Sequence, residues 1–75
     1  MTRAIDKVPM LYVEGLRIDA YSSTRDMKRL KLLRDDYEFY SRVAPIEFRN
    51  LWRSTLVYCD MKIVELDPRF LQNIA

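Results

Sequence analysis

The 75-residue chain contains no histidine, one glycine and one cysteine. Without an imidazole, Ser–His–Asp and Cys–His catalytic arrangements, HExxH helices and Cys/His zinc sites are excluded. One glycine cannot build the glycine-rich loops that bind nucleotide phosphates. A lone cysteine forms no internal disulfide, and no apolar run approaches the ~20 residues of a membrane span. We therefore expect a cytoplasmic protein that is not an enzyme, binds no cofactor, metal or membrane, and has no evident small-molecule substrate.

What the chain does contain is typical of one small folded domain. Hydrophobic residues make up 49% of the chain and aromatic residues 12%, which is enough for a core. The length is close to the lower limit for a self-sufficient core, so association with another chain would add stability. The net charge of +2, from 13 basic and 11 acidic residues, neither demands nor excludes a polyanionic partner. We expect a flexible N-terminal arm over residues 1–8 and a single domain over residues 9–75.

The segment from Pro45 to Leu66 shows the clearest pattern. Its apolar residues recur at intervals of three and four, which places them on one face of a helix. Pro45 suits the first helical position, and Pro68 prevents the helix from continuing. The main stripe consists of Phe48, Trp52, Leu56, Cys59, Ile63 and Leu66. A second stripe consists of Ile46, Val57, Met61 and Val64.

A second helix is predicted from about Thr24 to Arg42. Ser23 followed by Asp26 resembles a capping box at its start. Its main stripe is Met27, Leu30, Leu33, Tyr37 and Tyr40, and its smaller stripe is Leu32, Phe39 and Val43. The short link before Pro45 predicts that the two helices fold back as an antiparallel pair. After Pro68, the spacing of the apolar residues predicts a short C-terminal helical turn.

The segment around Gly15, the only glycine, favours a β-hairpin. If Glu14 and Gly15 form a two-residue turn, the apolar residues of the flanking strands fall on one face. Those residues are Leu11, Val13, Leu16 and Ile18. The alternative is one strand bent at a bulge on Gly15. The predicted fold class is therefore α+β, with an N-terminal β-hairpin, an antiparallel two-helix unit and a short C-terminal helical turn.

Few side chains are candidates for chemistry. Cys59 is the one strong nucleophile, but it lies on a main apolar stripe and has no base beside it, so we interpret it as a core residue. The acids Asp35, Asp36 and Glu38 have basic residues within helical reach and indicate a solvated charged face. Trp52 lies centrally in its stripe, which favours a place in the core over an anchoring role at an interface.

Two apolar stripes on each of two helices exceed what so short a chain can bury, which indicates an interface. We therefore expect a protein-interaction module, such as a small regulator, inhibitor or accessory subunit, or a homo-oligomer. It would dock through an apolar helix face or the hairpin edge. The expected interface residues are Leu32, Phe39, Val57, Met61 and Val64. The alternative is a nucleic-acid-binding protein whose second helix contacts phosphates. Its contacts would be Arg25, Lys28, Arg29, Lys31 and Arg34.

Overall fold

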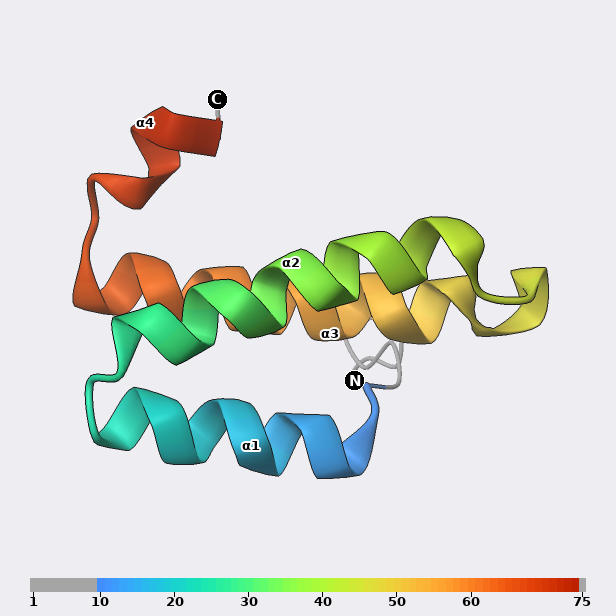
Figure 1. The fold of residues 1–75 in the computed structure, drawn as a ribbon, viewed down its shortest axis with the longest axis horizontal. Helices are drawn as coiled ribbons and strands as arrows, with labels where there is room; N and C mark the ends of the chain where they lie inside the picture. The colour runs from blue at the N-terminus through green and yellow to red at the C-terminus, as the bar shows by residue number, and fades with distance from the viewer. Residues whose placement is uncertain (1–9, 75) are drawn as a thin grey trace, which may run out of the picture.

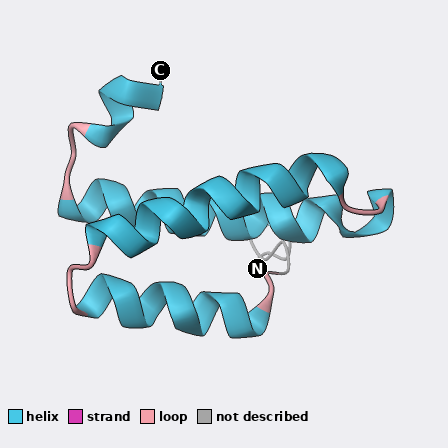
Figure 2. Ribbon diagram, viewed as in Figure 1, coloured by secondary structure: helices cyan, strands magenta, loops and turns pink. Residues whose placement is uncertain are grey.

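The computed structural model describes residues 10–74, so the predicted arm over residues 1–8 lies outside the described residues. The helices are α1 (Tyr12–Ser23), α2 (Met27–Val43), α3 (Ile46–Leu66) and α4 (Phe70–Ile74). Helices α2 and α3 form an antiparallel pair, α1 lies alongside this pair, and α4 turns back beside the end of α3 (Figure 1). No strand occurs between residues 10 and 74, which form a small all-helical domain (Figure 2).

The predicted α+β fold is wrong, because the segment expected to form a β-hairpin is helix α1. Gly15 lies inside this helix without a positive φ, and its amide donates to the Leu11 carbonyl at 3.0 Å. Gly15 and Ile18 are buried three residues apart, as on a helix face, whereas Val13 and Leu16 are exposed. Alternation over so few residues does not separate strand from helix. This segment therefore has no hairpin edge through which it could dock.

The two longer helices follow their predicted ranges closely, with differences at their starts. Helix α2 begins later than predicted, because Asp26 is its N-cap and accepts a hydrogen bond from the Arg29 amide at 3.1 Å. Arg25 precedes this cap with a φ of 57°, which gives the α1–α2 turn its left-handed backbone. Pro45 is the N-cap of α3, and α3 ends at the residue before Asp67.

The core lies where the helices meet. Its buried apolar residues are Ile18, Leu30, Leu33, Tyr37, Cys59, Ile63 and Phe70. The buried Thr55 hydroxyl donates to the Leu51 carbonyl at 2.8 Å and accepts from the Leu11 amide at 3.2 Å, so its hydrogen-bonding groups are satisfied. Ile18 of α1 belongs to this core. Helix α1 therefore covers apolar side chains that the α2–α3 pair alone would leave exposed.

Two side-chain hydrogen bonds also hold α1 against the pair. The buried Tyr37 of α2 donates its hydroxyl proton to Glu14 at 2.7 Å. Tyr58 of α3 donates to Asp19 at 2.5 Å. The hydrogen bond to Asp19, followed by burial, raises the pKa of Tyr58 to about 12. Each carboxylate of α1 therefore fixes the position of α1 on a different partner helix.

Helix α1 is too short to cover the whole pair. At 1.5 Å per residue, its 12 residues span about 18 Å and the 21 residues of α3 span about 32 Å. The end of the pair that holds the α2–α3 connection therefore extends beyond α1 (Figure 1). Within residues 10–74, no third helix packs against the apolar side chains at this end.

Candidate interaction surfaces

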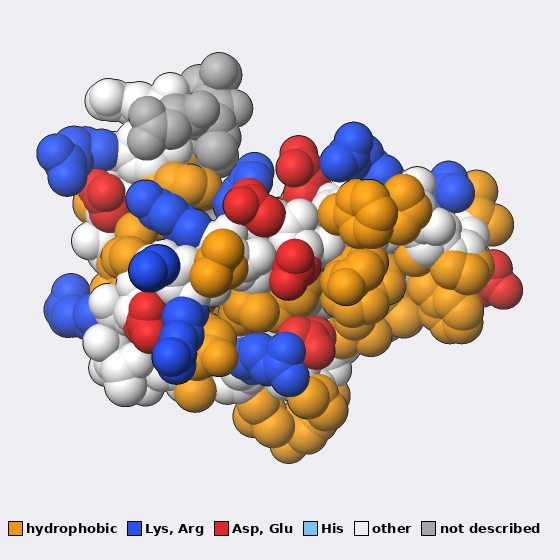
Figure 3. All heavy atoms as spheres, viewed as in Figure 1, with side chains coloured by type: hydrophobic (Ala, Val, Ile, Leu, Met, Phe, Trp, Pro, Cys, Tyr) orange, Lys and Arg blue, Asp and Glu red, His pale blue; other side chains and the backbone are white. Residues whose placement is uncertain are grey.

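An exposed apolar surface lies at this uncovered end. We name it the tip patch, and it consists of Phe39, Tyr40, Val43, Ile46 and Phe48. Their side chains are 51%, 40%, 55%, 77% and 48% exposed, respectively. The space-filling view shows apolar side chains covering the end where α2 meets α3 (Figure 3). Continuous apolar surface of this kind on a small domain is typical of a binding site.

The tip patch is exposed although two of its members belong to the main stripes. Tyr40 and Phe48 fall on the helix faces that were predicted to pack inward, yet they are 40% and 48% exposed. Tyr40 has other aromatic rings as neighbours: it packs on Trp52 with ring centroids 4.6 Å apart, and Phe39 meets it edge-on at 5.7 Å. The Arg49 side chain braces the connection by donating to the Ala44 carbonyl at 2.8 Å.

The five predicted interface residues lie on two different helix surfaces. Leu32 and Phe39 lie on the outer side of α2, and Val57 and Met61 lie on the outer side of α3, all between 51% and 58% exposed. The fifth, Val64, is half-buried. Only Phe39 belongs to the tip patch. The predicted set is therefore accessible, but the fold does not bring it together as one surface.

A shallow groove runs between α3 and α4. It has a volume of about 320 Å³. Its lining residues are Asp60, Met61, Val64, Glu65 and Leu71. Asp60 is held by Arg34 at 2.8 Å, and Glu65 by Lys62 at 3.7 Å. The α3–α4 groove therefore has an apolar base, and both acidic side chains at its edge already form ion pairs.

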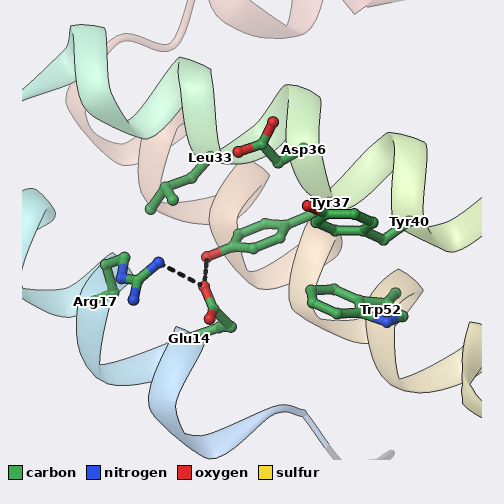
Figure 4. A pocket seen from close by; sticks show the side chains of 7 residues that line it. All are labelled: Glu14, Arg17, Leu33, Asp36, Tyr37, Tyr40 and Trp52. Atoms are coloured by element: carbon green, nitrogen blue, oxygen red, sulfur yellow. Dashed lines mark hydrogen bonds and ion pairs between the residues drawn. The ribbon is translucent and has the colours of Figure 1, made fainter. Parts of the chain in front are cut away.

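A second hollow, which we name the aromatic cleft, lies where α1 approaches the α2–α3 pair. Its volume is about 290 Å³. It is lined by Glu14, Arg17, Leu33, Asp36, Tyr37, Tyr40 and Trp52. Figure 4 shows Glu14 and Arg17 reaching from α1 towards the Tyr37 hydroxyl, with the Tyr40 and Trp52 rings at the other side. Because Tyr40 also belongs to the tip patch, the two surfaces adjoin.

The aromatic cleft has an ordered polar side. Glu14 accepts from the Tyr37 hydroxyl and from the Arg17 guanidinium, at 2.7 and 3.4 Å. Burial, and then the hydrogen bond to Glu14, raises the pKa of Tyr37 far above its usual value, so this hydroxyl keeps its proton. The Tyr37 ring lies 5.9 Å from that of Trp52. The sequence pattern missed this site, because the charged residues of α1 were assigned to a hairpin.

The five basic residues predicted for nucleic-acid contact do not form one continuous surface. Arg34 is directed inward, to Asp60 and to the Phe70 ring, whose centroid lies 5.6 Å away. Arg29 pairs with the capping carboxylate at 3.6 Å. Arg25, Lys28 and Lys31 remain exposed. Lysine and arginine side chains do gather over the end of the bundle that holds the α1–α2 turn (Figure 3).

Cys59 is a core residue, as predicted. It is fully buried, and its thiol donates to the Leu30 carbonyl at 3.4 Å. Burial raises the pKa of Cys59 to about 12, so almost no nucleophilic thiolate forms at neutral pH. Within the described part of the chain, no group of three acidic or cysteine side chains is arranged to hold a metal ion.

No helix in the described range is long and apolar enough to cross a membrane. Comparison of the chain with protein families, with curated proteins and with solved structures finds no match. Only the surfaces of this chain therefore indicate what it binds.

Proposed function

We propose that this protein is a non-enzymatic protein-interaction module that docks through the tip patch, as a small regulator, inhibitor or accessory subunit. The observation that supports the proposal is the length mismatch between α1 and the pair it covers. Near the α2–α3 connection, five large apolar side chains are exposed within ten residues of sequence. Burying such surface against a partner gains about 25 cal/mol per Å² of apolar area.

The bound surface is either that of another protein or that of a second copy of this chain. Sedimentation of the purified chain over a range of concentrations separates these two partners, because self-association depends on the concentration of the chain. A chain that sediments as a monomer at every concentration tested has a different protein as its partner.

Two valines provide a matched test of the docking surface. Val43 in the tip patch and Val57 on the outer side of α3 are 55% and 53% exposed and both lie in helices. Val43→Lys should weaken association at least tenfold, because a docked valine contributes about 1.5 kcal/mol and a buried ammonium adds a desolvation cost. Val57→Lys adds the same charge outside the patch and should leave association unchanged.

The assay compares partners captured from the native source by the parent chain and both variants, followed by calorimetry with the purified partner. Loss of binding by Val57→Lys and not by Val43→Lys would place docking on α3. Unchanged binding by both would remove the tip patch from the proposal. Far-UV circular dichroism should show that both variants retain the helical fold.

The nucleic-acid alternative has narrower support. It rests on the gathering of basic side chains at the end of the bundle that holds the α1–α2 turn (Figure 3). Lys28 and Lys31 are the α2 residues best placed to bind phosphates, since both are exposed; Lys31 also acts on the Asp67 carboxylate, whose pKa it helps to lower. Phosphate binding would weaken steeply with salt and would be lost in Lys28→Gln/Lys31→Gln, whereas apolar docking would hardly respond to either change.

A further inference from the structure

The aromatic cleft carries a negative charge that no basic side chain among residues 10–74 neutralises. Arg17 is the counter-charge of Glu14, which also accepts a hydrogen bond from the Tyr37 hydroxyl. The Asp36 carboxylate lines the same cleft, and no ion pair or hydrogen bond to it occurs within residues 10–74. Two carboxylates against one guanidinium leave the lining with a net charge of −1.

The rest of the lining favours the same kind of ligand. The negative face of an aromatic ring attracts an ammonium or guanidinium group within about 6 Å, and tryptophan is the strongest such partner. The chain already uses this interaction elsewhere, as where Lys62 lies 5.3 Å from the centre of the Tyr58 ring. In the cleft, the rings of Tyr40 and Trp52 line the side opposite the Glu14–Arg17 pair (Figure 4).

Size and position restrict the ligand further. Pockets for drug-sized molecules begin at about 300 Å³, so a half-open cleft of about 290 Å³ suits a single long side chain. Tyr40 belongs to both the cleft and the tip patch, so a protein docked on the patch reaches the cleft directly.

We propose that the aromatic cleft receives a positively charged side chain, arginine or lysine, of the protein that docks on the tip patch. The inference rests on the proposed docking function and adds the chemistry of the partner. The charged head would lie between the Asp36 carboxylate and the rings of Tyr40 and Trp52. Its apolar stem would pack on Leu33.

Trp52 is the only tryptophan in the sequence, so its spectroscopic signals detect binding in the aromatic cleft. The whole protein is titrated at about 0.15 M salt with acetylated, amidated alanine peptides that carry one central arginine, lysine, methionine or glutamate. The readouts are Trp52 fluorescence and the NMR signal of its indole N–H. We expect saturable changes at millimolar arginine or lysine peptide, and none with the methionine or glutamate peptides.

Charge variants test the sign of the interaction. Asp36→Asn should weaken binding of the arginine peptide about two- to fivefold, as for a partly exposed ion pair. Arg17→Gln should strengthen it, because the repelling cation is removed. Asp35→Asn is the matched control: Asp35 adjoins Asp36 in sequence but is 72% exposed, faces Arg34 and does not line the cleft. This variant should bind as the parent does.

An aromatic variant tests the ring contribution. Tyr40→Leu keeps apolar volume in the cleft but removes the π-face, and should weaken binding about two- to fivefold. Circular dichroism of every variant establishes that the helices are retained. Weakening by Asp36→Asn without an effect of Tyr40→Leu would limit the interaction to the ion pair and overturn the aromatic part of the proposal.

Other results overturn the proposal as a whole. Binding of the glutamate peptide that disappears in Arg17→Gln would make the cleft a site for acidic side chains. Absence of any change at Trp52 by both readouts would leave the cleft without a ligand of this class. Failure of the docking function is distinct from either: the peptides would still bind, while Val43→Lys would keep its partner.

Discussion

Replacing Gly15 by alanine tests the helical assignment of the N-terminal segment. Gly15 is buried inside α1, its φ is not positive, and its amide is hydrogen-bonded to Leu11. Alanine can adopt this backbone without strain. In a two-residue hairpin turn, by contrast, this position would require a left-handed backbone that favours glycine. Gly15→Ala is therefore expected to stabilise a helix and to destabilise a hairpin.

The expected gain follows from two opposing effects. Alanine in a helix interior is more favourable than glycine by about 0.5–1 kcal/mol. Against this, the added Cβ would lie 2.8 Å from the terminal methyl carbon of Met10, which must move. That methyl group ends a flexible side chain, so we expect it to turn aside at small cost. The net stabilisation is about 0.5 kcal/mol, or a rise in Tm of about 2–4 °C.

The measurement is thermal and urea unfolding followed by circular dichroism, carried out in the parent chain and in a Met10→Ala background. In that background the close approach is gone, so Gly15→Ala should gain close to the full ~1 kcal/mol. A loss of more than ~1 kcal/mol in both backgrounds would contradict the helical assignment, because it would mean that residue 15 requires a conformation that only glycine adopts readily.

Two further predictions concern the hydrogen bonds that hold α1. Tyr37→Phe should lower the free energy of unfolding by about 1–2 kcal/mol in urea titrations, because Glu14 loses a buried donor at 2.7 Å. The control Tyr40→Phe should stay within about 0.5 kcal/mol, since the Tyr40 hydroxyl makes no hydrogen bond in the described structure, and equal losses would contradict the assigned bond. Tyr58 has a pKa of about 12 in the folded chain and about 10 when unfolded, so its contribution to stability is complete below pH ~10 and is lost as the pH rises towards 12. Absorbance titration of tyrosinate should show the pKa of Tyr58 falling towards its usual value in Asp19→Ala, and an unchanged titration would mean that Asp19 is not its main cause.

The α2–α3 pair could be predicted from the sequence because each end of α3 is defined locally. Pro45 and Pro68 restrict the backbone on either side, and the apolar spacing between them continues for six turns. Helix α1 has no such support. It has no side-chain cap at Leu11, and Gly15, which usually marks a turn, lies within it. Its helical form depends on packing Ile18 into the core of the other two helices, which is a tertiary effect.

The same dependence explains what was missed at the surface. The main stripes correctly located core residues such as Leu30 and Ile63. They could not show that Tyr40 and Phe48 stay 40% and 48% exposed, because helix α1 and its extent were not predicted. The aromatic cleft was missed for the same reason, since half of its polar lining comes from α1. A signal was present, because Glu14 and Arg17 are three residues apart, as neighbouring charges on a helix are.

Substitutions at the uncovered end of the α2–α3 pair and substitutions in the part covered by α1 have different effects on the core. Val43 is 55% exposed, so replacing it changes the proposed docking surface while the core is left intact. Arg34 is different: it compensates the charge of Asp60, whose pKa is raised by burial, so removing it would leave a half-buried carboxylate without its partner. Reduced nucleic-acid binding by an Arg34 variant would then reflect weakened packing between α2 and α3. Lys28 decides that alternative more clearly than Lys31, because Lys28 is exposed, whereas the Lys31 ammonium lies 6.0 Å from the ring centre of the core residue Phe70.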